Sequence, residues 1–285
     1  MTSTRDGPAG PLFLPLFLPA DRPDRYAKAF AAGADAVILD LEDAVAPGGK
    51  DAARAALLAA RDAVAAAACP VLVRVNAEGS PWQAEDLAAA AALPLAGLVL
   101  PKAESAEAVA AAGRAAGGRP VLALIESARG VAAARDIARA AARLAFGSID
   151  LAADLGCADA REPLLAFRSE TVLASRLAGR PAPLDGVTPG YRDPAPVEAE
   201  AREAATLGFG GKLLIHPAQV APARAGFGPT AAEVAWAGRV LAAARDGRAV
   251  AVDGAMVDAP VRLRAEAILR RAGVPAQADR NSLPS

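Results

Sequence analysis

PVLALIES at residues 120–127 is an apolar run of six residues that ends in two polar ones, Glu126 and Ser127. A run this short and this continuously apolar is typical of a strand covered on both faces, as in parallel sheets. Alanine-rich sequence, a strong helix former, follows it at 129–141. We therefore interpret 120–125 as a buried strand that presents a carboxylate at its C-terminal end.

The same unit, an apolar run followed by an alanine-rich helix, recurs along the chain. Further strands are predicted at 12–19, 36–41, 71–75, 97–100, 143–147, 183–187 and 211–215. Further helices are predicted at 24–32, 50–67, 83–92, 105–116, 164–178, 196–207 and 217–225. Alternation of eight strands with eight helices predicts an α/β fold, a closed (β/α)8 TIM barrel, with an open doubly wound sheet as the alternative.

The pattern changes after residue 228. A long helix is predicted at 230–244, an irregular segment at 249–260 and a last helix at 260–272. This piece is too small for an independent core. We expect a barrel domain at 1–228 and a helical C-terminal extension at 229–285 that packs as a lid or arm.

Composition excludes several classes of protein. A net charge of −1 and 4% aromatic residues disfavour nucleic-acid binding. The apolar run at 12–20 is short and contains prolines, which argues against a signal peptide or a membrane span. The two cysteines, Cys69 and Cys157, are far apart and indicate free thiols in a reducing compartment. We expect a cytoplasmic protein with no nucleic-acid or membrane partner.

Polar residues follow or end most of the predicted strands. In a (β/α)8 barrel all these ends meet on the face that carries the active site. The residues at issue are Asp40, Glu42, Asp43, Arg74, Asn76, Lys102, Glu126, Asp150, Asp185 and His216.

Glu126 and Asp150 are the candidate metal ligands. Two carboxylates, completed by water and a chelating substrate, suit Mg²⁺, with Mn²⁺ as a substitute. Zinc is disfavoured because the chain has one histidine and two distant cysteines. The alternative for Glu126 is a capping role or an ion pair with Arg129 at the start of the next helix.

Arg74 stands in an otherwise apolar strand, where a guanidinium can stabilise a developing oxyanion or bind a carboxylate. A structural ion pair with Glu42 or Asp43 is the alternative, and both roles are compatible. Glu42 and Asp43 are interpreted as groups that orient Arg74 or waters around the metal. Their alternative is a favourable position at a helix N-terminus.

Lys102 and His216 have two interpretations each. Lys102 suits the nucleophile of a Schiff-base aldolase, but an ion pair with Glu104 explains it more simply. His216 precedes Pro217, where a helix is expected to begin. A structural or ligand-edge role is favoured over a general base, because no nucleophile partner is evident.

An ordered series of motifs resembles the HpcH/HpaI aldolase and citrate lyase β-subunit family, in particular its free-standing CoA-ester lyases. The resemblance spans about residues 11–272. The motifs are FLPADRPDRYAKA (17–29), VILDLEDAV (37–45), VRVN (73–76), LVLPKAES (98–105), LALIESARG (122–130), FGSIDLAADLG (146–156), LDGVT (184–188), GFGGKLLIHPAQV (208–220) and GAMVDAPV (254–261).

The resemblance implies site roles. Glu126 and Asp150 correspond to the metal ligands and Arg74 to the group that contacts the substrate oxygen. Asp258 resembles an acid/base aspartate that the lid delivers, often to a neighbouring subunit of a trimer or hexamer. The stretch from Arg22 to Lys28 resembles the CoA-binding edge.

The chain departs from the family pattern in two places. A glutamate often precedes the ligand aspartate in the family, whereas this chain has Ile149. The region 157–168 also diverges, so the acyl pocket is not defined by the resemblance.

The implied reaction is Mg²⁺-dependent cleavage or formation of a 3-hydroxyacyl-CoA, such as malyl-, citramalyl- or citryl-CoA. The products of cleavage are an acyl-CoA and a 2-oxo acid. Glu42, Arg74 and Asp258 are the expected catalytic residues. Arg22, Lys28, Asp43, Lys102 and His216 are, with Arg74, the expected substrate- or CoA-binding residues. The alternatives are an aldolase acting on free hydroxy-oxo acids and an accessory β subunit of a citrate lyase complex.

Overall fold

The computed structural model describes residues 12–244 and 250–273. The chain divides into two compact units, with the boundary between Phe227 and Gly228. Within the described residues, no helix has the length and apolar character needed to cross a bilayer. Cys69 and Cys157 are both free, as predicted.

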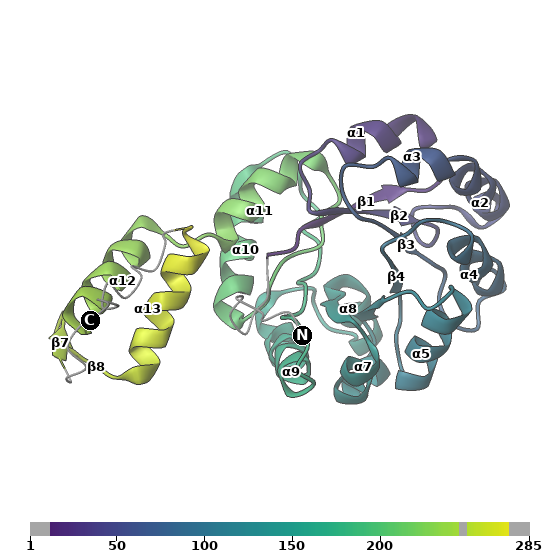
Figure 1. Cartoon of the computed structure of the whole chain (residues 1–285). Coiled ribbons are helices and arrows are strands. Elements are labelled where there is room, and N and C mark those ends of the chain that lie inside the picture. Colours follow the sequence, from purple (N-terminus) through teal and green to yellow (C-terminus); the bar gives the residue numbers. More distant parts are fainter. Residues whose placement is uncertain (1–11, 245–249, 274–285) are drawn as a thin grey trace, which may run out of the picture. The chain divides into compact units, whose positions relative to one another are not determined.

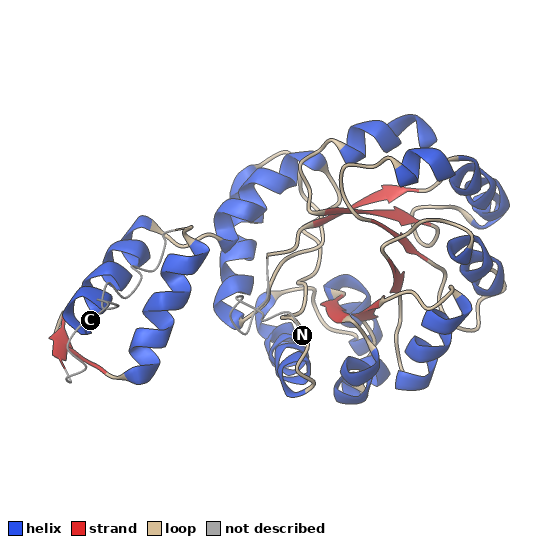
Figure 2. Cartoon of the chain, viewed as in Figure 1, coloured by secondary structure: helices blue, strands red, loops and turns tan. Residues whose placement is uncertain are grey.

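The first unit is built on a six-stranded parallel sheet in which the strands follow the order of the chain. The strands are β1 (Pro15–Pro19), β2 (Ala36–Asp40), β3 (Val71–Arg74), β4 (Gly97–Leu100), β5 (Val121–Ile125) and β6 (Arg143–Phe146). The sheet curls into an arc with the helices on its outside (Figures 1 and 2). The α/β prediction is confirmed, and β2 to β6 lie within one residue of the predicted bounds.

The other two predicted strands, 183–187 and 211–215, form isolated parallel bridges instead of strands. Leu184 bridges Ala145 of β6, and Asp185 bridges Lys212. Leu214 bridges Leu16 of β1, and its carbonyl accepts a hydrogen bond from Phe17 N at 2.8 Å. These two segments therefore connect the last strand of the arc to the first.

Residues of the strands alternate between two buried apolar layers. Along β2, Val37 and Leu39 pack in the layer that includes helical residues such as Leu57. Ile38 packs in a second layer on the inner face of the arc. That inner layer consists of Ala36, Ile38, Leu72, Val99, Leu122, Leu124, Ala145, Leu184 and Leu213. Burial of both faces explains why the sequence of each strand is continuously apolar.

The helices of the first unit lie between and after the strands. They are η1 (Pro23–Arg25), α1 (Tyr26–Phe30), η2 (Pro47–Gly49), α2 (Lys50–Ala59), α3 (Arg61–Ala65), α4 (Gln83–Ala91), α5 (Ala106–Ala115), α6 (Ala128–Ala132), α7 (Ala134–Ala140), α8 (Ser148–Leu155), α9 (Arg161–Leu177), α10 (Pro194–Leu207), η3 (Pro217–Gln219) and α11 (Val220–Phe227). Helix α8 was not predicted, because the first helix expected after the strand at 143–147 was the one at 164–178. The predicted helix at 50–67 is divided at Ala60.

The second unit contains α12 (Ala231–Ala243), strands β7 (Val250–Val252) and β8 (Ala255–Val257), and α13 (Ala259–Arg271). The two strands are antiparallel, so the prediction of an irregular segment at 249–260 was wrong. Asp253 and Gly254 have φ angles of 52° and 81°. An Asp-Gly pair with two positive φ angles is the sequence that favours a two-residue hairpin turn. The predicted helices at 230–244 and 260–272 are confirmed, and the tail at 274–285 lies outside the described residues.

Candidate active site

Three charged residues continue the inner-face positions of their strands. Asp40, Arg74 and Glu126 stand two residues after Ile38, Leu72 and Leu124, which belong to the inner apolar layer. Because side chains alternate along a strand, all three point to the inner side of the arc at the C-terminal edge. The sheet therefore brings an arginine and two carboxylates to one place.

Glu126 is a buried carboxylate, with 3% of its surface exposed. Its Oε1 accepts a hydrogen bond from Lys102 N at 2.8 Å. Burial, together with the charges of Glu42 and Asp150, raises the pKa of Glu126 to about 8. An acid held in this environment ionises readily only if a cation is bound beside it.

Gly147 follows β6 and packs against Glu126. A Cβ atom at this position would lie 2.6 Å from Glu126 Cβ and 2.5 Å from Glu126 Oε2. Both distances are far below van der Waals contact. A hydrogen in place of a side chain is therefore required for the Glu126 carboxylate to occupy its position.

Asp150 lies in the first turn of α8, is partly exposed and interacts electrostatically with Glu126. Within the described part of the chain its carboxylate makes no hydrogen bond or ion pair. The described residues contain no group of three or more His, Cys, Asp or Glu side chains that could hold a metal. A pair of carboxylates with no third protein ligand suits Mg²⁺, because this ion keeps water and substrate oxygens as its other ligands. It does not suit zinc, which prefers histidine and cysteine ligands.

Arg74 forms a two-pronged ion pair with Asp40. Its Nε and Nη2 donate to Asp40 Oδ1 and Oδ2 at 2.7 and 2.6 Å. The expected partners, Glu42 and Asp43, lie 3.0 and 3.4 Å from Arg74 Nη1. The guanidinium also lies over the Phe17 ring, 4.8 Å from its centroid. The pairing of Arg74 with Asp40 was not predicted from the sequence. Asp40 lies two residues after the inner-face residue Ile38, and this spacing could have identified it as a partner.

Glu42 is 6% exposed and lies between two cations, Arg74 and Lys102. Lys102 Nζ donates to its Oε1 at 2.8 Å. Oε2 lies 3.0 Å from Arg74 Nη1, outside hydrogen-bond geometry, and is buried without a hydrogen-bond partner among the described residues. Burial raises the pKa of Glu42, and Arg74 and Lys102 oppose that shift. Asp43, in contrast, is largely exposed.

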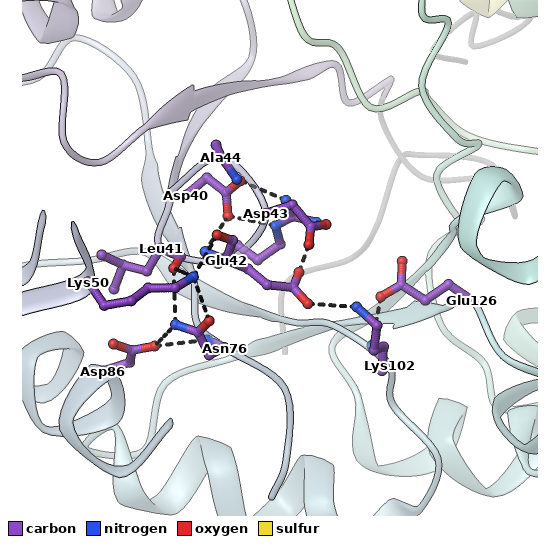
Figure 3. A network of polar contacts seen from close by, with 11 residues as sticks. Asp40, Leu41, Glu42, Asp43, Ala44, Lys50, Asn76, Asp86, Lys102 and Glu126 are labelled. Atoms are coloured by element: carbon purple, nitrogen blue, oxygen red, sulfur yellow. Dashed lines mark hydrogen bonds and ion pairs between the residues drawn. The ribbon is translucent and has the colours of Figure 1, made fainter. Parts of the chain in front are cut away.

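Lys102 connects the two carboxylates, through Nζ to Glu42 and through its backbone N–H to Glu126 (Figure 3). Its φ of 47° is in the left-handed region, which is uncommon for a residue with a side chain. The alternative partner Glu104 was wrong: Glu104 accepts from Ser127 Oγ at 2.8 Å and lies 3.9 Å from Arg129. The alternative pairing of Glu126 with Arg129 was therefore also wrong.

His216 is the N-cap of η3, where its Nδ1 accepts from Ala218 N at 3.1 Å. Its ring stacks on that of Tyr191 at 4.2 Å between centroids. The fully buried Gln219 donates to Thr188 O and Gly190 O at 2.8 and 2.9 Å and so holds the Tyr191 loop. His216 thus caps a helix and packs against Tyr191, and its predicted contact with the substrate stays a prediction.

Asp185 does not face the site. It directly follows Leu184, which belongs to the inner apolar layer, so its side chain points to the opposite face. Arg168 of α9 donates to both of its oxygens at 3.2 and 2.9 Å. The expectation that every polar strand-end residue contributes to the active face was wrong here, because alternation turns Asp185 toward the helices.

Among the described residues of the first unit, Arg22 and Lys28 make no hydrogen bond or ion pair with this cluster. Arg22 donates to both Asp24 oxygens at 2.9 and 2.8 Å, and Lys28 is exposed on α1. Asp258 belongs to the second unit, where it is the N-cap of α13 and accepts from Val261 N at 3.1 Å. Within the first unit, the structure joins Glu42, Arg74, Lys102, Glu126 and Asp150, but not Arg22 or Lys28.

Comparison with known proteins gives one consistent result. The HpcH/HpaI aldolase/citrate lyase family model matches residues 14–217. A citrate lyase subunit beta-like protein of Mycobacterium tuberculosis is 45% identical over 275 residues, covering 93% of this chain and 96% of that protein. A (3S)-malyl-CoA thioesterase of Cereibacter sphaeroides is 36% identical over 254 residues, covering 85% and 88%.

Solved structures agree. CitE from Mycobacterium tuberculosis, in complex with magnesium, acetoacetate and coenzyme A, is similar with a TM-score of 0.83 and 42% identity. The similarity covers 93% of this chain and 99% of that one. The resemblance inferred from the ordered motifs is thus confirmed. The chain belongs to the HpcH/HpaI aldolase/citrate lyase family.

Proposed function

We propose that this protein is a Mg²⁺-dependent carbon–carbon lyase that cleaves, or forms, a 3-hydroxyacyl-CoA. The products of cleavage are an acyl-CoA and a small oxo acid. The observation that carries the proposal is the convergence of Glu126, Asp150 and Arg74 at one edge of the sheet. The similar CitE has been solved with magnesium, acetoacetate and coenzyme A together, which supports the same classes of ligand here.

Glu126 and Asp150 are the residues that would hold Mg²⁺ or Mn²⁺. When bound, the cation supplies Lewis-acid stabilisation of negative charge on the oxygens of the oxo acid. Neutralisation of the two repelling carboxylates is a further consequence, because each lies in the electrostatic field of the other. Arg74, held by Asp40, keeps a permanent positive charge on the inner side of the same edge.

The chain's own groups account for the remaining steps. In the cleavage direction Glu42, whose Oε2 has no hydrogen-bond partner among the described residues, would accept the substrate hydroxyl proton, and the adjacent carbon–carbon bond then breaks and leaves a thioester enolate. Arg74 stabilises the charge that develops on oxygen. Asp258 then donates a proton to the enolate carbon, or removes it in the synthetic direction. The C-terminal unit would exclude water during the lifetime of the enolate.

The proposal includes an architecture. The bridges of 184–185 and 211–214 to β6 and β1 support a closed (β/α)8 barrel in which these segments serve as strands seven and eight. The units 1–228 and 229–285 would act as barrel and lid. We also propose that Arg22, Lys28, Asp43, Lys102 and His216 contact the CoA ester.

Assembly is part of the proposal as well. The protein would be a cytoplasmic trimer or hexamer in which each lid serves a neighbouring subunit. Closed rotational symmetry would give every active site one such lid.

Two alternatives have specific support. The 36% identity to a malyl-CoA thioesterase favours hydrolysis of a related thioester. The citrate lyase subunit beta of Escherichia coli, also 36% identical, favours a role as an accessory β subunit. A Schiff-base aldolase is disfavoured. Burial lowers the pKa of Lys102, but its hydrogen bond to Glu42 and the neighbouring carboxylates raise it above the ordinary value, so the amine is a protonated and poor nucleophile.

The test is an assay of the purified chain with malyl-, citramalyl-, citryl- and 3-hydroxy-3-methylglutaryl-CoA, with and without Mg²⁺. A lyase releases an acyl-CoA and one oxo acid per turnover. A thioesterase releases free CoA and no oxo acid. Free hydroxy-oxo acids test for an aldolase, and added acyl-carrier partners test for an accessory subunit. Absence of oxo acid from every CoA ester would refute the proposal.

A further inference from the structure

A buried lysine lies beside the candidate site and belongs to none of the predicted roles. Lys50 is the first residue of α2 and is 4% exposed. Its Nζ donates to Leu41 O at 2.6 Å, Glu42 O at 2.7 Å and Asn76 Oδ1 at 2.8 Å (Figure 3). An ammonium has three N–H donors, so all of them are used. Two of the three acceptors are backbone carbonyls of the segment that carries Glu42.

The third acceptor is itself fixed. Asn76 Nδ2 donates to Leu41 O at 3.0 Å and to Asp86 Oδ2 at 2.6 Å. Asp86 is fully buried and accepts from Arg54 Nη1 at 3.0 Å. The network therefore ties the C-terminal ends of β2 and β3 to α2 and α4 through buried, hydrogen-bonded side chains.

The other side of the same turn is held by Asp40. Its two oxygens accept from Glu42 N at 2.9 Å and Ala44 N at 3.1 Å. The backbone around Glu42 is thus restrained through its N–H groups by Asp40 and through its carbonyls by Lys50. Since Asp40 also holds Arg74, the two restraints bring Glu42 and Arg74 into one rigid arrangement.

This restraint explains an otherwise unfavourable position. The Glu42 carboxylate is buried, and its Oε2 has no hydrogen bond among the described residues. A buried carboxylate oxygen without a donor is costly, and a free backbone would let it turn toward water. We propose that Lys50 is a positioning residue of the active site, which acts through the Leu41 and Glu42 carbonyls to hold the Glu42 carboxylate against Lys102 and Arg74. The kinetic consequences rest on the lyase function proposed above.

The variant Lys50→Met removes the three donors and keeps the length of the side chain. Lys212→Met is the matched control. Lys212 is also a buried lysine, 2% exposed, and its Nζ donates to Gly186 O at 2.6 Å and lies 3.2 Å from Glu200 Oε2. Both variants should unfold at lower temperature. Lys50→Met, unlike Lys212→Met, should also lower kcat by about 10- to 100-fold. Its KM for the CoA ester should stay within about threefold of that of the parent protein.

A double-mutant cycle separates positioning from a general loss of stability. If Lys50 acts through Glu42, Lys50→Met should have little further effect on kcat once Glu42→Gln is present. Lys212→Met combined with Glu42→Gln should instead be additive. Additive losses for the Lys50 and Glu42 pair, or an unchanged kcat of Lys50→Met, would overturn the proposal.

A crystal structure of Lys50→Met gives a readout that does not depend on the reaction. The expected result is a Glu42 carboxylate that has left Lys102 and faces solvent. If Glu42 still contacts both Lys102 and Arg74 in the variant, the positioning role of Lys50 is wrong even if lyase activity is found. If Glu42 moves but no CoA ester is cleaved, the positioning role stands and the proposed function fails.

Discussion

Glu126 combines deep burial with two neighbouring acids, and these features define its chemistry. A cation is the one ligand that relieves both the burial and the repulsion. Asp150 adds a second oxygen donor from the first turn of α8, where the helix N-terminus also favours negative charge. The metal-site assignment can be tested with substitutions that keep the shape of each side chain.

Glu126→Gln and Asp150→Asn should each lower Mg²⁺-dependent turnover by more than about 100-fold, because each removes a charged ligand. Binding of Mn²⁺, followed by electron paramagnetic resonance, should weaken in parallel. Circular dichroism should remain that of the parent protein. Near-normal turnover in both variants would mean that the metal lies elsewhere.

The raised pKa of Glu126 predicts a pH dependence in two measurements. Metal binding requires the ionised acid, so Mn²⁺ affinity should rise with pH up to about 8 and should release a proton. In metal-free protein the folded state holds this proton above pH 4.5, where the unfolded state has lost it. The free energy of unfolding should therefore fall as pH rises from about 4.5 to 8.

Glu126→Gln is the control for this prediction, because an amide does not titrate. Its denaturant midpoint in the presence of a chelator should change less over that pH interval than the midpoint of the parent. Identical pH profiles for the two proteins would show that Glu126 has an ordinary pKa.

At the scale of elements, the C-terminal end of β2 organises the site. Its last residue, Asp40, holds Arg74 of β3 and two backbone N–H groups of the following turn. Strand alternation and the parallel register Asp40↔Arg74 place the two side chains next to each other. The turn and the strand edge therefore form one unit that depends on a single carboxylate.

Asp40→Ala should destabilise the protein by about 3 to 5 kcal/mol, because Arg74 is left as a buried charge without its main partner. Urea unfolding with a constant m-value would measure this change. Asp24→Ala, which breaks an exposed pair with Arg22, is the control and should leave the midpoint unchanged. A similarly small effect of Asp40→Ala would show that Glu42 and Asp43 suffice for Arg74.

The sequence alone allowed most of the elements and the polar cluster to be predicted, since apolar runs and their polar ends are local properties. Which side chains pair with each other was harder to predict from the sequence. Asp40 and Asp185 both end or interrupt apolar runs, yet alternation turns the first inward and the second toward α9. Lys50 was missed because a lysine at the start of a helix ordinarily lies on the surface, and only tertiary packing buries it.

At the scale of the whole molecule, the candidate site and Asp258 belong to different compact units. Asp258 caps α13, and asparagine is an equally good N-cap. Asp258→Asn should therefore preserve the second unit while removing the proposed acid/base group. The expected result is retained CoA-ester binding without exchange of the α-proton of the thioester in ²H₂O.

Mixing two inactive variants tests whether the lid serves a neighbouring subunit. Co-refolded Glu126→Gln and Asp258→Asn chains at equal amounts should recover about a quarter of the parent activity, since random assembly gives that share of intact sites. Each variant refolded alone is the control and should stay inactive. No recovery in mixed oligomers would mean that each lid closes on its own chain.

Gly147 has a consequence for how this enzyme can vary. Its backbone lies directly beside Glu126, so any side chain at position 147 would collide with the Glu126 side chain in its present position. In a library of random variants, position 147 should accept no other residue as long as selection requires the metal, although glycine has no functional group to contribute. A shorter side chain at position 126 would not release this restriction, because every residue other than glycine keeps a Cβ atom there, and a Cβ at position 147 would lie 2.6 Å from it. Position 147 should therefore stay glycine even in variants in which Glu126 has been exchanged.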